Sequence, residues 1–265
     1  MRLLFIGDIA GRPGRQCLKE LLPELTGRFA PDFIIANGEN AAGGAGITLS
    51  VYRELKQLGI DVITGGNHIW DNKDVFRFID DEPCLLRPAN YPLDDTPGRG
   101  SHVFKTARGT GIGILNLAGR IFMQPLDCPF KRAVLEIEQI RKETPVIVVD
   151  FHAEATAEKQ ALAWYLDGRV SAVIGTHTHV LTADERILPQ GTAYITDAGM
   201  TGLFNSILGV DRHEALQKFL TGLPQSFKIS RGAMQFNGVF LEIDERSGKA
   251  LSIKRIKEVI EKPDY

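Results

Sequence analysis

Short apolar runs alternate with amphipathic segments along the first two-thirds of the chain. Residues 3–6 and 33–36 are continuous apolar runs, and residues 61–64 form a third strand-like run. Between the first two runs, four leucines recur at helical spacing in a segment that starts near Pro13, and proline is favoured in the first turn of a helix. Near-continuous apolar strands separated by helices predict a sheet that is buried on both faces.

The rest of the chain adds further strands. Residues 85–119 contain proline, glycine and two strand-like runs, which we expect to pair as antiparallel strands. Strands dominate again after Arg186. The expected strands of this part are 102–106, 112–117, 146–149, 170–174, 193–195, 238–243 and 251–256. The expected helices after the first are one that begins at Thr48 or Ser50, then 131–143, 156–167 and 211–220.

The order of these elements predicts an α/β fold of two packed mixed β-sheets flanked by helices. A chain of 265 residues can bury a sizeable core, although length alone does not decide between one domain and two. No linker, internal repeat or low-complexity segment interrupts the sequence. We therefore expect one domain that spans residues 1–265.

Composition and charge disfavour several classes of function. The net charge of −2 gives no broad basic surface for long nucleic acid, and a small anionic ligand is still allowed. No segment approaches the ~20 apolar residues of a membrane helix, so no membrane partner is expected. The three cysteines form no Cys-x-x-Cys pair, which favours reduced thiols in a cytoplasmic protein. The oligomeric state stays open, a homo-oligomer included.

The ends of the predicted strands carry residues of the types that bind metal ions. In the segment 175–179, His177 and His179 follow an apolar run, and their alternation lets both side chains converge on one point. Ligands of α/β sheets gather beyond the carboxyl ends of the strands. The strand-end residues of this kind are Asp8, Glu39, Asn67, His152, His177 and His179.

Six such donors are more than one catalytic ion with open positions requires. They suit two metal ions about 3.5–4 Å apart that share a carboxylate and a hydroxide derived from water. Oxygen and nitrogen ligands without thiolate fit Mn, Fe, Zn or Co. The sequence therefore predicts a binuclear metal centre without fixing the metal.

Four short segments resemble, in order, the motifs of the calcineurin-like metallophosphoesterases. These segments are GDIAG at 7–11, GEN at 38–40, GNH at 66–68 and GTHTH at 175–179. His152, alone after a strand, matches the remaining ligand of that family. The segments that resemble the YmdB-type branch are NGEN at 37–40, the glycine-rich loop 42–46 and YITDAGMTG at 194–202. The resemblance implies a metallophosphoesterase-like α/β/β/α sandwich over nearly the whole chain.

The same resemblance implies an activity and a role for each residue. The branch is described as phosphodiesterases of cyclic nucleotides, so it implies hydrolysis of small phosphodiesters such as 2′,3′-cAMP by attack of a metal-bridging hydroxide. His68 would lie near the leaving oxygen as the catalytic residue. The implied ions are Fe or Mn, with Zn as an alternative. The implied ligands are Asp8, Glu39 and His179 for the first metal, and Glu39, Asn67, His152 and His177 for the second.

Three positions depart from the usual family pattern. Ala10 stands where many members have histidine, so the first metal would be held by fewer ligands. Glu39 stands where aspartate is usual, and its longer side chain requires its loop to lie further back. Ile69 follows His68 where an acidic residue is common, which leaves Asp71 as the candidate substitute.

Other interpretations are left open by the sequence. Asn40 and Asp150 could contact a ligand or the substrate, or be polar residues of a loop and a strand end. The loop 42–46 could be a flexible lip of the site or a simple linker. The alternative to an enzyme is a metal-binding regulatory or scaffold protein with little or no turnover, and the intact Asn67–His68 pair argues against it.

Overall fold

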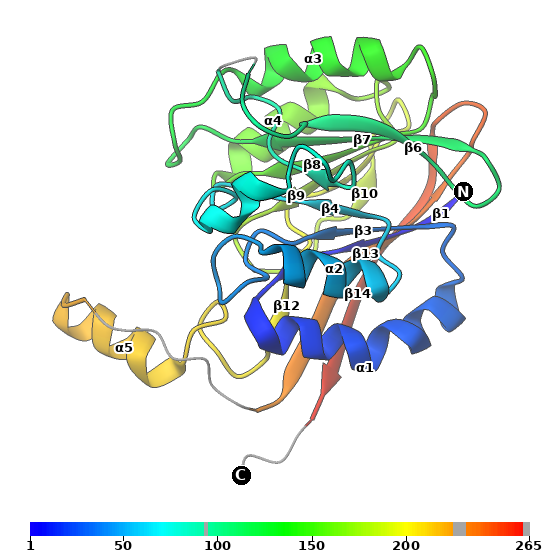
Figure 1. Cartoon of the computed structure of the whole chain (residues 1–265). Coiled ribbons are helices and arrows are strands. Elements are labelled where there is room, and N and C mark those ends of the chain that lie inside the picture. The colour runs from blue at the N-terminus through cyan, green and yellow to red at the C-terminus, as the bar shows by residue number, and fades with distance from the viewer. Residues whose placement is uncertain (93–94, 225–231, 262–265) are drawn as a thin grey trace.

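The computed structural model describes residues 1–92, 95–224 and 232–261, which form four layers in the order helices, sheet, sheet, helices (Figure 1). Helices α1 (Gly11–Phe29) and α2 (Leu49–Gln57) cover the outer face of one sheet. Helices α3 (Pro129–Ile140) and α4 (Thr156–Tyr165) cover the outer face of the other. Helix α5 (Arg212–Thr221) projects from the body of the molecule. The predicted α/β fold of two mixed sheets flanked by helices is confirmed.

The first sheet joins strands from both ends of the chain. Strands β1, β3, β4 and β5 are parallel neighbours, and β2 pairs parallel with β12. Strand β13 lies in the middle and pairs antiparallel with β1, β12 and β14. The strands of this sheet are β1 (Arg2–Ile6), β2 (Asp8–Ile9), β3 (Phe33–Asn37), β4 (Val62–Thr64), β5 (Leu85–Leu86), β12 (Met200–Leu203), β13 (Met234–Ile243) and β14 (Ala250–Ile260).

The second sheet has a parallel centre and antiparallel edges. Strands β7, β8, β9 and β11 are parallel neighbours, whereas β6 and β10 pair antiparallel at the two edges. The strands of this sheet are β6 (Ser101–Lys105), β7 (Gly111–Ala118), β8 (Ile147–His152), β9 (Ala172–Thr176), β10 (Arg186–Ile187) and β11 (Ala193–Ile195).

Three apolar cores separate the four layers. In β1, Leu3 and Phe5 face the second sheet, whereas Leu4 and Ile6 face α1 and α2, because successive side chains of a strand point to opposite faces. The third core, which includes Leu162 of α4, lies between the second sheet and its helices. Burial on both faces explains why these strands are apolar at nearly every position.

The predicted elements are present with shifted ends, and some short elements were not predicted. Strand β9 ends two residues later than the expected 170–174, so it extends to Thr176 beside the histidine pair. Strand β13 begins four residues before the expected 238. The short strands β2, β5, β10 and β12 and the 3₁₀ turn η1 (Lys73–Arg77) carry no periodic signal of their own. Among the described helices, none combines the length and apolar character that crossing a membrane requires.

Candidate metal centre

The six residues selected from the sequence lie together where the two sheets meet. The first sheet contributes Asp8 at the start of β2, Glu39 after β3 and Asn67 after β4. The second sheet contributes His152 at the end of β8, and His177 and His179 after β9. The carboxyl ends of parallel strands share one edge of a sheet, and the two edges here face a common space.

The densest part of the site surrounds one atom, Nε2 of His152. It lies 3.0 Å from Oε1 of Glu39, 3.0 Å from Oδ1 of Asn67 and 3.0 Å from Nδ1 of His177. One ligand atom from each of Glu39, His152 and His177 lies within 4.8 Å of the others. Imidazole nitrogens, carboxylates and amide oxygens all offer lone pairs, so they converge in this way only around a proton or a cation.

The other ring nitrogen of His152 is held by a buried chain of hydrogen bonds. The hydroxyl of Thr176 donates to Oδ1 of Asp150 at 2.7 Å and accepts from Nδ1 of His152 at 2.9 Å. Asp150 is fully buried, and Asn37 and Thr64 donate to its other oxygen. Because Nδ1 carries the proton, Nε2 of a neutral His152 presents its lone pair to the centre, as metal-binding histidines do.

Burial and neighbouring charge displace the pKa values of this cluster. Burial opposes the ionisation of Glu39, but the charge of His152 and a hydrogen bond from it prevail and lower the pKa of Glu39 to about 2. Burial also opposes the charging of His152, but Glu39 prevails and raises the pKa of His152 to about 9. Burial and the charge on His152 lower the pKa of His177 to about 4. In the metal-free protein, a proton on His152 thus takes the place of a cation.

Asp8 carries a buried carboxylate oxygen that lacks a hydrogen bond within the described ranges of the chain. Its Oδ1 has no hydrogen-bond partner among the described residues, whereas Oδ2 accepts from the backbone N–H of His177 at 3.2 Å. Burial raises the pKa of Asp8 to about 7, although the charges of His179 and His152 oppose this shift. An unpaired buried carboxylate oxygen is costly, and a metal ion would satisfy it. These side chains therefore fit a metal site.

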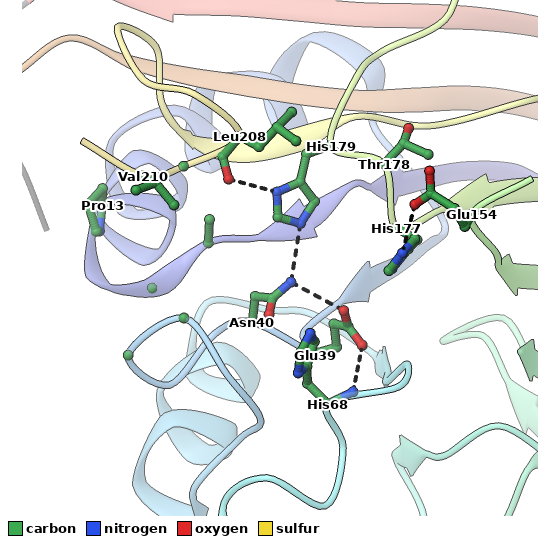
Figure 2. Close-up of a pocket in the computed structure, with 15 residues that line it drawn as sticks. Pro13, Glu39, Asn40, His68, Glu154, His177, Thr178, His179, Leu208 and Val210 are labelled. Carbon is green, nitrogen blue, oxygen red and sulfur yellow. Dashed lines mark hydrogen bonds and ion pairs between the residues drawn. The ribbon is translucent and has the colours of Figure 1, made fainter. Parts of the chain in front are cut away.

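His179 lies outside the dense cluster, on the other side of Asn40 (Figure 2). Its Nδ1 donates to the backbone oxygen of Leu208 at 3.1 Å, and its Nε2 lies 3.2 Å from Nδ2 of Asn40 and 4.0 Å from Oδ1 of Asp8. Asn40 also donates to Oε1 of Glu39 at 3.3 Å. The set Asp8, Glu39 and His179 is thus more open than the cluster around His152, and the amide of Asn40 lies between two of its members.

His68 has a carboxylate partner in spite of Ile69. Its Nδ1 lies 2.6 Å from Oδ2 of Asp71, and its backbone N–H donates to Oε2 of Glu39 at 3.1 Å. The turn that follows β4 brings Asp71 back beside the imidazole, so a carboxylate three residues later occupies the role left open by Ile69. Because Nδ1 bonds to an acceptor, Nε2 is the nitrogen that remains for a substrate.

Glu154 is a site residue that sequence reasoning missed. Its Oε2 lies 3.1 Å from Nε2 of His177 (Figure 2), and the other ring nitrogen, Nδ1, faces His152. The only sequence signal is its position two residues after His152, since alternate residues of an extended segment point the same way. Glu154 is half exposed, which is ordinary for a glutamate in a loop.

A pocket of about 500 Å³ opens over the cluster. Its polar side includes Glu39, His68 and the histidine pair, and its apolar side includes Pro13, Leu208 and Val210 (Figure 2). Gly43 and Gly44 also line it, so the glycine-rich loop borders the site. Among the lining residues that the structure describes, none is lysine or arginine. An anionic ligand would therefore depend on bound cations for charge compensation.

Comparison with known proteins gives a consistent picture. The family model described as "YmdB-like protein" matches residues 4–256. The chain is 54% identical to a 2′,3′-cyclic-nucleotide 2′-phosphodiesterase of Bacillus subtilis (strain 168), over 97% of this chain and 96% of that protein. It is 37% identical to a putative phosphatase/phosphodiesterase of Mycoplasma genitalium, over 100% of this chain and 95% of that protein.

Two solved structures share the fold over nearly the whole chain. A hypothetical protein of Thermus thermophilus superposes with a TM-score of 0.90 at 43% identity, covering 99% of this chain and 100% of that one. A structure described as a novel phosphatase of Mycoplasma pneumoniae superposes with a TM-score of 0.91 at 37% identity, covering 99% of this chain and 95% of that one.

Proposed function

The chain belongs to the YmdB-like family of calcineurin-like metallophosphoesterases and is a phosphodiesterase, and we propose that it hydrolyses 2′,3′-cyclic nucleotides at a pair of metal ions. The observation that carries the proposal is the convergence of lone pairs on Nε2 of His152, beside the unsatisfied Oδ1 of Asp8. The 54% identity to a 2′,3′-cyclic-nucleotide 2′-phosphodiesterase supports the substrate class.

The donor set suits two ions that share one residue and otherwise have separate ligands. Glu39 would be shared, with Asn67, His152 and His177 completing one site, and with Asp8 and His179 completing the other. Oxygen and imidazole nitrogen donors fit iron, manganese and zinc alike, and the resemblance to the family favours iron or manganese, with zinc as an alternative. Bound ions would supply Lewis acidity, which polarises phosphoryl oxygens and compensates their negative charge.

The chain's own contribution to the reaction is to orient groups and supply a proton. Asp71 accepts a hydrogen bond from Nδ1 of His68, so a doubly protonated His68 can donate its Nε2 proton to the ribose oxygen that leaves phosphorus. Hydrolysis of the cyclic ester forms a P–O bond to a water oxygen and breaks the P–O bond to one ribose oxygen. That ribose oxygen is a poor leaving group unless it is protonated. The apolar side of the pocket, which includes Pro13, Leu208 and Val210, gives the base a surface to pack against.

We also propose a cytoplasmic location, which the state of the cysteines supports. Cys84 and Cys128 carry free thiols in the structure. Free thiols without a disulfide are usual where the compartment is reducing.

A substrate and metal panel tests the proposed function. The purified chain is assayed with bis-p-nitrophenyl phosphate and with 2′,3′-cyclic AMP, each in the presence of Mn²⁺, Fe²⁺, Zn²⁺ or a chelator, and bound metal is measured by elemental analysis. We expect turnover of both substrates, abolished by the chelator. A folded, metal-loaded sample that turns over neither substrate would favour the alternative of a metal-binding regulatory or scaffold protein.

A further inference from the structure

A fully buried lysine lies behind the metal centre. Lys159 belongs to α4, is completely inaccessible to solvent, and its Nζ lies 2.7 Å from Oδ2 of Asp197, which is equally buried. Burying an ion pair costs desolvation, and well-packed apolar residues in its place are often as stable or more stable. Stability alone therefore gives little reason for this pair, and its value lies in what Asp197 holds in place.

Asp197 holds the residue between the two histidines. Its Oδ2 accepts from the backbone N–H of Thr178 at 3.0 Å and from the Thr178 hydroxyl at 2.8 Å. His177 and His179 on either side have φ values of +100° and +65°. Residues other than glycine rarely adopt positive φ values of this kind. Such conformations persist only where the surroundings enforce them. The two bonds to Thr178 supply that enforcement at the midpoint of the histidine pair.

The same carboxylate also supports the opposite side of the site. Oδ1 of Asp197 accepts from the backbone N–H of Gly199 at 2.8 Å. The backbone oxygen of Gly199 in turn accepts from the N–H of Asp8 at 2.9 Å. One side chain thus connects to both the histidine pair and Asp8, and Lys159 is the cation that fixes its orientation.

We propose that Lys159 is a positioning residue, which acts through Asp197 to hold Asp8, His177 and His179 in the arrangement that binds the metal pair. This inference rests on the proposed function, because Lys159 and Asp197 can position metal ligands only if Asp8, His177 and His179 bind metal. Lys159 touches neither substrate nor metal in this scheme. Its ammonium anchors the carboxylate, and the carboxylate anchors the backbone that carries the three ligands.

The test separates metal binding from folding. We compare the Lys159→Met variant with Leu162→Ala, a matched control one turn further along α4 whose leucine is equally buried in the core. The dissociation constant for Mn²⁺ is measured by calorimetry, the spectrum of bound Mn²⁺ by electron paramagnetic resonance, and the unfolding midpoint without metal by circular dichroism. The ligands themselves are unchanged in both variants.

We expect Lys159→Met to weaken Mn²⁺ binding roughly 10–100-fold and to alter the Mn²⁺ spectrum, as loss of a group that orients metal ligands does. Leu162→Ala is expected to lower the unfolding midpoint yet keep the wild-type dissociation constant and spectrum. Wild-type Mn²⁺ affinity and spectrum in Lys159→Met would overturn the positioning role of Lys159 and leave the proposed function standing. Failure of the wild-type protein to bind Mn²⁺, Fe²⁺ or Zn²⁺ would overturn the proposed function as well.

A second variant decides the question if Lys159→Met does not fold. Thr178→Val keeps both buried charges and the side-chain shape, and it removes only the hydroxyl that donates to Asp197. We expect a smaller loss of Mn²⁺ affinity and a changed spectrum with little change in the unfolding midpoint. Wild-type affinity and spectrum in this variant would then refute the positioning role.

Discussion

The imidazole of His152 contacts side chains from three other segments of the site, and each of its two nitrogens has a defined purpose. Nδ1 is tied to Thr176 and through it to Asp150, and this bond fixes the tautomer. Nε2 faces Glu39, Asn67 and His177. His179 follows the same rule, since its Nδ1 donates to a backbone oxygen and leaves Nε2 toward the centre. Each of these histidines is therefore prepared to offer one lone pair to a cation.

Replacement of His68 by alanine tests its role as proton donor. We expect turnover of 2′,3′-cyclic AMP to fall roughly 10²–10⁴-fold, which is the usual contribution of general acid–base assistance. Metal content should stay near the wild-type value, because His68 is expected to face the substrate rather than a metal. Steady-state kinetics and elemental analysis on the same samples measure both effects. Loss of bound metal would show instead that His68 is a ligand or a structural residue.

A milder substitution at Asp71, which contacts His68, tests the same role. Asp71→Asn keeps the size of the side chain and weakens its bond to Nδ1 of His68. We expect a loss of turnover smaller than that of His68→Ala, and no further loss when the two changes are combined. Additive losses in the double variant would mean that Asp71 acts independently of the imidazole.

Metal affinity should fall as the pH is lowered, because protons compete for the same atoms. In the metal-free protein burial raises the pKa of Asp8 to about 7, and Glu39 raises the pKa of His152 to about 9. Below pH 7 Asp8 is mainly protonated, and below pH 9 His152 is too, so a metal must displace these protons. We expect the Mn²⁺ dissociation constant to rise between about pH 8 and pH 6.

Calorimetry in buffers of different ionisation enthalpy measures this effect directly. Binding of Mn²⁺ near neutral pH should release protons to the buffer, and the number released should change between pH 6 and pH 8 as Asp8 titrates. An affinity that is constant across this range, with no proton release, would show that Asp8 and His152 do not bind the ion.

The strands and loops show why the sequence predicts some elements and conceals others. Strands β1 and β3 are buried at nearly every position, so their apolar runs stand out. The start of β13 is concealed, because Asn237 interrupts the apolar pattern yet is buried. Its amide donates to the backbone oxygen of Met200 at 2.7 Å, and that pairing joins β13 to a segment 37 residues away. No local pattern contains such a contact.

The same limit applies to the site. Asp8, Glu39 and the histidines could be selected because they follow apolar strands, and ligands of α/β sheets gather beyond the carboxyl ends of the strands. Glu154 and Lys159 could not, because a glutamate in a loop and a lysine on a helix are normally solvated. Only the fold reveals that one lies against His177 and the other is buried beneath the histidine pair.

The loop after β4 approaches Glu39 and His152 closely, and a glycine allows it. A Cβ on Gly66 would lie 2.0 Å from Oε2 of Glu39 and 2.4 Å from Nε2 of His152. We expect Gly66→Ala to displace both ligands and to weaken Mn²⁺ binding by about tenfold or more, by analogy with other changes that misplace metal ligands. Calorimetric titration with Mn²⁺ measures the change.

A glycine in α1 provides the matched control. A Cβ on Gly27 meets no atom within 4 Å. Gly27→Ala should leave Mn²⁺ affinity unchanged and raise the free energy of unfolding by about 0.5–1 kcal/mol, because alanine is favoured over glycine within a helix. Equal Mn²⁺ affinity in Gly66→Ala and Gly27→Ala would contradict the close approach of this loop to the ligands.

The two sheets contribute equally to the centre, so a bound metal would connect them. Asp8, Glu39 and Asn67 belong to the first sheet, and the three histidines to the second. We expect Mn²⁺ at about 100 times its dissociation constant to stabilise the folded chain by about 2.7 kcal/mol, and a chelator to reverse the effect. Thermal unfolding followed by circular dichroism measures the shift.

Asp8→Asn separates this stabilisation from the stability of the metal-free protein. The change removes a buried carboxylate whose Oδ1 has no partner among the described residues, so the metal-free variant should unfold at no lower temperature than the wild type. The rise produced by Mn²⁺ should shrink because a ligand is lost. An undiminished rise would show that the ion binds elsewhere.

The central place of β13 limits how far the protein can be shortened. This strand pairs with every residue of β1, and the backbone oxygen of Asn237 accepts from the N–H of Gly7, next to Asp8. A truncation that stops before Met234 would therefore remove one of the two strands that pair with β1 and leave Asp8, a proposed metal ligand, unsupported. Anyone engineering a minimal catalyst from this scaffold should expect to keep the hairpin of β13 and β14, remote as it is in sequence from every proposed metal ligand.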